Sequence, residues 1–230
     1  MMMLILACIA FVGTHFLLSH PLRAPLVARL GANGFLGVYS IVAFATLGWM
    51  AHVYQTLPAQ APLWPVGNGL WAAGTAVMWV GAVLFAGSLV RNPALPDPKG
   101  PPATVPTPKG VFAITRHPMM WGFGLWALVH AAVFPIPANL VLTAAIAVLA
   151  LVGAALQDAK KATLQPGFWP EWSRTTSYWP FAALIAGRVP WRSAMPGAHA
   201  LGAGTVIWAA ATWAHIPLAG VAAGIWRWIG

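Results

Sequence analysis

Apolar residues in this chain gather in long runs, and shorter polar connections that carry proline and the basic residues separate them. An α-helix rises about 1.5 Å per residue, so roughly 20 apolar residues cross the ~30 Å hydrocarbon core of a bilayer. Runs of about that length occupy residues 2 to 19, 35 to 54, 68 to 90, 112 to 134, 138 to 156 and 199 to 222. The pattern predicts an all-α, polytopic integral membrane protein with about six transmembrane helices.

Basic residues are concentrated in alternate connections between the predicted spans. Lys and Arg occur in the connections after the first, third and fifth spans, whereas residues 55 to 67 and 135 to 137 contain neither. Because Lys and Arg near the ends of spans stay on the cytoplasmic side, this alternation predicts that both termini lie on the outer, periplasmic side. Arg227, near the outer carboxyl end, is an exception to the pattern.

Two of the inner connections have a distinct composition. Residues 92 to 110 contain seven prolines, which favour an extended, hydrated backbone and predict a semi-rigid cytoplasmic loop. Residues 157 to 197 begin with polar and basic residues and lead into the apolar stretch 181 to 187, which is too short to span a membrane. We expect this second segment to be cytoplasmic or interfacial, and residues 1 to 230 to form a single membrane domain.

Composition supports the bilayer as the solvent of this chain. Only 7% of the residues are charged and 60% are hydrophobic, whereas a soluble domain has roughly 25% charged residues. The formal charge of +9 comes from thinly spread basic residues, so we attribute it to membrane topology and predict no nucleic-acid partner. Cys8 is the only cysteine, which excludes a disulfide within the chain and a cysteine-based zinc site.

Histidines are the candidate functional residues within the predicted spans. The three acidic residues, Asp97, Asp158 and Glu171, all fall in predicted inner connections, which excludes paired-carboxylate catalysis inside the membrane. His15 and His130 occupy different spans, and two imidazoles without cysteine or carboxylate can hold a haem iron from both sides. The alternative is that each imidazole bonds a backbone carbonyl. His15 is predicted to lie deeper toward the cytoplasm than His130, so joint ligation requires tilted helices or a shifted boundary.

Three segments resemble a known family of bacterial membrane proteins. Residues 14 to 23 read THFLLSHPLR, residues 34 to 40 read GFLGVYS, and residues 110 to 122 read GVFAITRHPMMWG. These segments resemble the NnrU family, and the likeness extends over nearly the whole chain. The family is associated with denitrification, so the resemblance implies a place in the bacterial inner (cytoplasmic) membrane beside a nitrite or nitric oxide reductase system.

The resemblance extends to a cofactor. The 15-cis-zeta-carotene isomerases of plants and cyanobacteria have a similar domain that binds haem b through histidines, and the matching residues here are His15 and His130. The resemblance therefore implies haem b, with these two histidines as ligands of its iron. Those enzymes have a cysteine three residues before the second histidine, where this chain has Ala127. A thiolate ligand and the isomerase activity are therefore not implied.

A more distant likeness concerns the Arg-His-Pro segment and the later Asp158. The pattern is similar to that of isoprenylcysteine carboxyl methyltransferases and phospholipid methyltransferases, in which these positions bind S-adenosylmethionine. The resemblance implies that Arg116, His117 and Asp158 form an alternative cofactor site at the inner surface. The chain departs from that pattern because it lacks the expected tyrosine and has one aspartate where two glutamates are expected.

These observations leave three hypotheses for function. The first is a membrane protein that binds haem b and supports nitrite and nitric oxide reduction. The second is an S-adenosylmethionine-dependent membrane methyltransferase that acts at the cytoplasmic surface. The third is a non-catalytic assembly factor for a neighbouring reductase, with the lipid bilayer as its other partner. The first two hypotheses place the site at opposite depths in the membrane.

Overall fold

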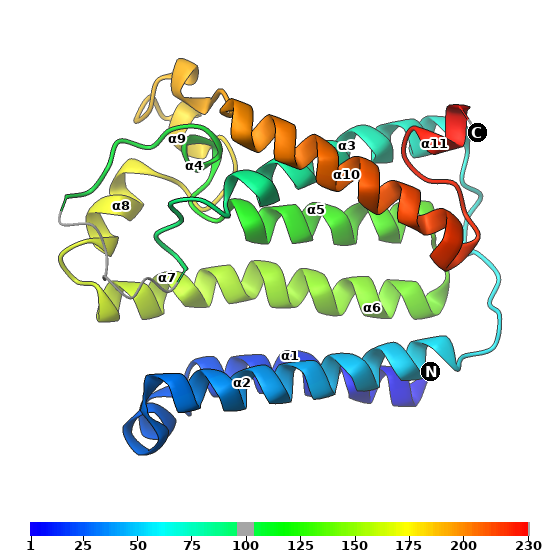
Figure 1. Ribbon diagram of the computed structural model, residues 1–230, viewed down its shortest axis with the longest axis horizontal. Helices are drawn as coiled ribbons and strands as arrows, with labels where there is room; N and C mark the ends of the chain where they lie inside the picture. The colour runs from blue at the N-terminus through cyan, green and yellow to red at the C-terminus, as the bar shows by residue number, and fades with distance from the viewer. Residues whose placement is uncertain (96–103, 230) are drawn as a thin grey trace.

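The computed structural model describes residues 1 to 95 and 104 to 229, and these residues form helices and loops without strands (Figure 1). The long helices are α1 (Met2–Ser19), α2 (Arg23–Gln55), α3 (Asn68–Gly87), α5 (Pro118–Val133), α6 (Pro137–Ala147), α7 (Gly153–Leu164) and α10 (Ala198–Ala219). The short helices are α4 (Val111–Ile114), α8 (Trp169–Thr175), α9 (Ala182–Ile185), the 3₁₀ turn η2 (Trp191–Ala194) and α11 (Trp226–Ile229). The π turn η1 (Val148–Val152) joins α6 and α7 into one rod, Pro137–Leu164. The prediction of an all-α chain is confirmed, while part of the proline-rich loop predicted over 92 to 110 lies outside the described residues.

Four elements are long and apolar enough to cross a membrane, namely α1, α2, α3 and the α6–α7 rod, with mean hydropathies between 1.6 and 2.3. Helix α5 is apolar but has 16 residues, or about 24 Å. Helix α10 has 22 residues and is not among these four. Large apolar side chains point away from the protein, with Phe44 73% exposed and Leu218 85% exposed, as lipid contact requires. The chain is a multi-pass membrane protein, and α5 and α10 correspond to the other two predicted spans.

The long helices pack in the order α10, α3, α5, α6, α1 and α2, each against the next (Figure 1). Helix α6 therefore lies between α1 and α5. The short elements α4, α8 and α9 gather at one end of the bundle, and both termini lie at the opposite end (Figure 1). Termini at a common end agree with an even number of crossings. By the distribution of basic residues, the end that holds α4, α8 and α9 is the predicted cytoplasmic end.

The span predicted over 112 to 134 is wrong at its beginning, because the chain leaves the helical conformation between α4 and α5. Thr115 is extended at φ −156°, ψ 150°, and His117 has φ −120°, ψ 55°. Proline disfavours the α conformation in the residue before it, and Pro118 suits the first position of α5. The break frees the backbone and side chains of residues 115 to 117 for contacts outside the helix.

Two further boundaries differ from the prediction. Helix α2 begins at Arg23 and not at residue 35, and Gly31 bends it with φ +70° and ψ 172°, a conformation that glycine adopts at little cost. The span predicted over 138 to 156 continues as a helix to Leu164, because residues 157 to 164 are mostly good helix formers. The prediction that Asp158 lies in a connection is therefore wrong, since Asp158 is on α7.

Candidate functional site

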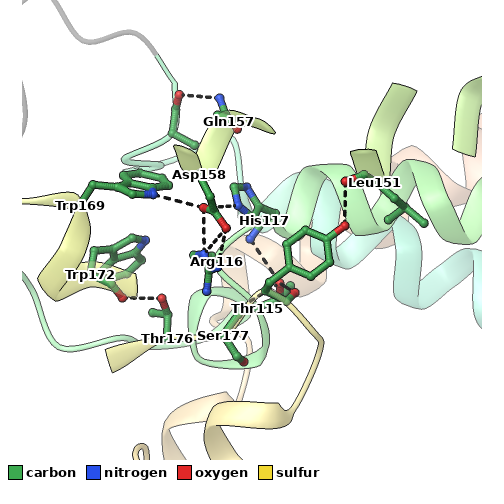
Figure 2. A network of polar contacts seen from close by, with 12 residues as sticks. Thr115, Arg116, His117, Leu151, Gln157, Asp158, Trp169, Trp172, Thr176 and Ser177 are labelled. Carbon is green, nitrogen blue, oxygen red and sulfur yellow. Dashed lines mark hydrogen bonds and ion pairs between the residues drawn. The ribbon is translucent and has the colours of Figure 1, made fainter. Parts of the chain in front are cut away.

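Asp158 accepts hydrogen bonds from three side chains on other elements (Figure 2). The Arg116 Nε lies 2.9 Å from each carboxylate oxygen, and a terminal guanidinium nitrogen donates to Oδ2. His117 Nε2 lies 2.8 Å from Oδ1, and Trp169 Nε1 donates to the same oxygen at 3.2 Å. We call Arg116, His117, Asp158 and Trp169 the Asp158 cluster. The structure thus brings together the three residues predicted as an alternative cofactor site and adds a tryptophan to them.

The break between α4 and α5 is held by the segment that follows α8. The Thr115 hydroxyl donates to the Tyr178 carbonyl at 2.7 Å, and the Arg116 backbone N–H donates to the Ser177 carbonyl at 2.9 Å. Trp121 Nε1 donates to the same Tyr178 carbonyl at 2.9 Å. The bond to Ser177 gives the Arg116 N–H the partner that a continuous helix would have supplied within itself. Together these bonds fix the backbone from which the Arg116 and His117 side chains reach Asp158.

The Tyr178 side chain connects the same segment to the membrane rod. Its hydroxyl donates to the Leu151 carbonyl at 2.7 Å. Leu151 lies in the π turn η1, where the carbonyls no longer follow the regular i to i+4 pattern. Burial, and after it the negative charge of Asp158, raises the pKa of the Tyr178 phenol, so the hydroxyl stays protonated and remains a donor.

The Asp158 cluster has the chemistry of a structural support. A guanidinium keeps its charge in proteins and matches a carboxylate in a fork geometry, so Arg116 holds Asp158 as an anion. The His117 side chain is 1% exposed and the Arg116 side chain is 13% exposed. A cofactor amino or ribose group could reach the carboxylate only by displacing one of these protein donors. The cluster therefore ties the start of α5 to α7 and α8, and both oxygens of the Asp158 carboxylate already have protein donors.

The predicted iron ligands lie on two sides of α6. His15 Nδ1 lies 2.6 Å from the Phe11 carbonyl, and the His15 ring contacts Tyr39 of α2 at a centroid distance of 5.5 Å. His130 Nδ1 lies 2.8 Å from the Trp126 carbonyl of its own helix α5. Within the described part of the chain, no hydrogen bond or ring contact joins His15 to His130. The structure does not bring these two imidazoles together, and their joint ligation of haem stays a prediction.

The imidazole beside His130 belongs to His215 of α10, and the two ring centroids are 6.0 Å apart. Both rings line an apolar cavity of about 400 Å³ between α3, α5 and α10. His215 Nδ1 lies 2.8 Å from the Ala211 carbonyl, so each of the two histidines bonds the carbonyl four residues before it. A nitrogen that bonds a carbonyl must carry the proton, which leaves the Nε2 lone pair of each neutral ring available. Two lone pairs at one cavity suit a metal centre.

The cavity wall also carries polar atoms that lack partners. The Thr75 hydroxyl on α3 and the Trp208 indole nitrogen on α10 are buried and have no hydrogen-bond partner among the described residues. A mostly apolar cavity with a few polar groups is typical of a small-molecule site, and such sites usually exceed about 300 Å³. The cavity therefore has the size and chemistry to hold an apolar ligand with a polar or metal centre.

Sequence reasoning missed two residues of these sites, His215 and Trp169. A signal for His215 existed, because its predicted span places it in the outer part of the membrane with His130, whereas His15 lies deeper. Trp169 follows Asp158 by 11 residues across a turn, and no local pattern connects the two.

Comparison with known proteins identifies a family for this chain. Neither a curated protein nor a solved structure matches it significantly. A family model described as "NnrU protein" matches residues 3 to 223, which is nearly the whole chain. The chain therefore belongs to the NnrU protein family.

Proposed function

We propose that this chain binds haem b in the bacterial cytoplasmic membrane and supports nitrite and nitric oxide reduction, with His130 and His215 as the iron ligands. The observation that carries the proposal is the pair of imidazoles at one apolar cavity, each with its Nδ1 engaged by its own helix. Two imidazoles are enough for a metal whose other coordination positions are filled by a macrocycle, as in haem. The membrane type and the link to denitrification rest on the resemblance to the NnrU family.

The residues around the cavity fit such a cofactor. The apolar walls suit a macrocycle, and the Trp126 ring stacks on His130 at a centroid distance of 4.1 Å, which fixes the plane of the imidazole. At the rim, the Arg227 guanidinium lies 4.7 Å from the ring centroid of Trp71, a residue of the cavity wall. The Arg227 Nε is buried and has no partner among the described residues. Its charge complements the propionate groups of haem b, which accounts for a basic residue on the predicted outer side.

Each part of the chain has a definite task in this proposal. When bound between two imidazoles, haem b would supply a redox-active iron that can accept and donate one electron. The bonds from Nδ1 to the Trp126 and Ala211 carbonyls orient the two imidazoles and keep the protons away from Nε2. The apolar walls exclude water from the space between the rings.

The methyltransferase alternative draws on Arg116, His117 and Asp158. The structure brings these residues together, but they bond one another, and Trp169 takes a further position on the carboxylate. The histidine pair has no such internal partner at Nε2 in the described part of the chain. We therefore favour the haem site over the methyltransferase site.

The absorption spectrum of the purified protein, expressed with ample haem, tests the ligand pair. We expect a Soret band that shifts on reduction and that His130→Ala or His215→Ala abolishes. His52→Ala is the matched control, because His52 is an exposed histidine in the last turn of α2, at the opposite end of that helix from Arg23. If His15→Ala lost the Soret band and His215→Ala kept it, the iron ligands would be His15 and His130, the pair predicted from sequence, and not His130 and His215. A wild-type protein without a Soret band would contradict haem binding.

The supporting role is tested in cells that respire nitrite. A strain whose only copy carries His130→Ala and His215→Ala should consume nitrite and nitric oxide more slowly than the wild type, whereas His52→Ala should not. Membrane levels of the three proteins, measured by immunoblotting, must be equal for the comparison to count. Equal consumption rates in all strains would contradict a role in nitrite or nitric oxide reduction, whatever the spectrum shows.

A further inference from the structure

Three cations lie at the predicted cytoplasmic end of the bundle. Arg23 begins α2, and Lys160 and Lys161 lie near the end of α7. The beginning of α2 and the end of α7 are at the same end of the bundle (Figure 1). The positive charges of Arg23 and Lys161 both repel that of Lys160, and Arg23 also repels Lys161. All three side chains are half-buried, so water screens this repulsion less than it would at an open surface.

The partners of these cations are neutral. The Lys160 ammonium donates to the Ser19 carbonyl at 3.4 Å, and the Lys161 ammonium donates to the Pro93 carbonyl at 3.3 Å. An ammonium has three donors, so each lysine keeps further donors for another acceptor. In the described residues, the carboxylates of Asp158 and Glu171 pair with other arginines, Arg116 and Arg174, and no ion pair neutralises the three cations.

A histidine adds a second observation at the same place. His20 follows α1 directly, next to the Ser19 carbonyl that Lys160 reaches. The Ser19 hydroxyl donates to the His15 carbonyl at 2.6 Å, so it accepts a bond from His20 Nδ1 at 2.8 Å. The His20 Nε2 is buried and has no partner in the described part of the chain. A doubly protonated His20 ring could donate from Nε2 to an anion at this place.

We propose that Arg23, Lys160, Lys161 and His20 bind the phosphate group of an anionic phospholipid in the cytoplasmic leaflet. A phosphate would remove the like-charge repulsion and accept bonds from the free donors. Basic pockets between transmembrane helices on the cytoplasmic side are suited to anionic headgroups. The apolar side chains beside this group, Leu17 at 52% and Leu22 at 43% exposure, offer a surface for acyl chains, which favours a lipid over a free anion.

The experiment measures binding to the purified full chain in neutral detergent, with or without haem, by titration calorimetry. The probes are short-chain phosphatidylglycerol, short-chain phosphatidylcholine and inorganic phosphate. We expect phosphatidylglycerol to bind more tightly than the other two, and the double variant Lys160→Gln, Lys161→Gln to weaken that binding by about tenfold or more.

The matched control is the double variant Lys109→Gln, Arg174→Gln, which removes the same charge from exposed positions in the predicted inner connections. It should bind phosphatidylglycerol like the wild type. Equal affinities for the two lipids, or equal losses in the two double variants, would overturn the proposed site. Inorganic phosphate that binds as tightly as phosphatidylglycerol would overturn the lipid as its source. None of these results depends on the haem proposal, because the probes report on the opposite end of the bundle.

Discussion

Replacement of Asp158 with alanine is expected to lower the free energy of unfolding by about 3–5 kcal/mol, the usual cost of removing one partner of a buried ion pair. The guanidinium of Arg116 would keep its charge but lose its carboxylate in a site where its side chain is 13% exposed. His117, whose side chain is 1% exposed, and Trp169 would lose the same acceptor. Most of the cost comes from these unpaired donors and not from the strength of the pair itself.

Unfolding of the purified variants in detergent micelles, followed by circular dichroism, measures this effect. Glu171→Ala is the matched control, because Glu171 pairs with Arg174 at the surface, where their side chains are 45% and 72% exposed. The control should unfold like the wild type, since exposed ion pairs contribute little. An Asp158→Ala protein of unchanged stability would contradict the structural role. If that protein had also lost affinity for S-adenosylmethionine, the methyltransferase alternative would gain support.

The long helices of this protein can be predicted from the sequence. In hydrocarbon, a spanning segment has no water to bond, so it must satisfy its backbone hydrogen bonds within its own helix. Helix α1 is predicted and observed over the same residues, 2 to 19, and α3 begins at residue 68 in both. The order in which the helices pack cannot be predicted from the sequence. Apolar surfaces on all sides of a helix show lipid contact but do not say which neighbour it meets. For that reason the sequence could not choose between His15 and His215 as the partner of His130.

The Asp158 cluster was predictable in part. The Arg-His-Pro segment at 116 to 118 indicates a helix beginning, because proline restricts the residue before it. The resemblance to methyltransferases singled out Arg116, His117 and Asp158, and the structure joins them. What the residues do there depends on Trp169 and on the carbonyls of residues 177 and 178, which reach the cluster only after α8 has folded back over α7. Such long-range contacts leave no local pattern in the sequence.

The close approach of α10 to α3 depends on Gly204. A Cβ at this position would lie 2.7 Å from the Cα of Val83 and 2.9 Å from its backbone nitrogen, closer than side chains come to such atoms. Backbone atoms cannot turn away as a side chain can, so the two helices would have to separate. Small residues at such crossings allow the close packing that holds helices together in lipid. Gly204→Ala is therefore expected to lower the free energy of unfolding by about 1–3 kcal/mol.

Gly202→Ala is the matched control for this change. Residue 202 lies on the same helix as Gly204, and a Cβ there would meet no atom within 4 Å. Alanine is the better helix former, so this variant should be as stable as the wild type or slightly more stable. The comparison also reports on the cavity, since α3 forms one of its walls and α10 carries His215. A shift of α10 would move His215 relative to His130, so Gly204→Ala should weaken the Soret band while Gly202→Ala keeps it. Equal stability and equal spectra for the two alanine variants would contradict both the tight crossing and the place of His215 in the haem site.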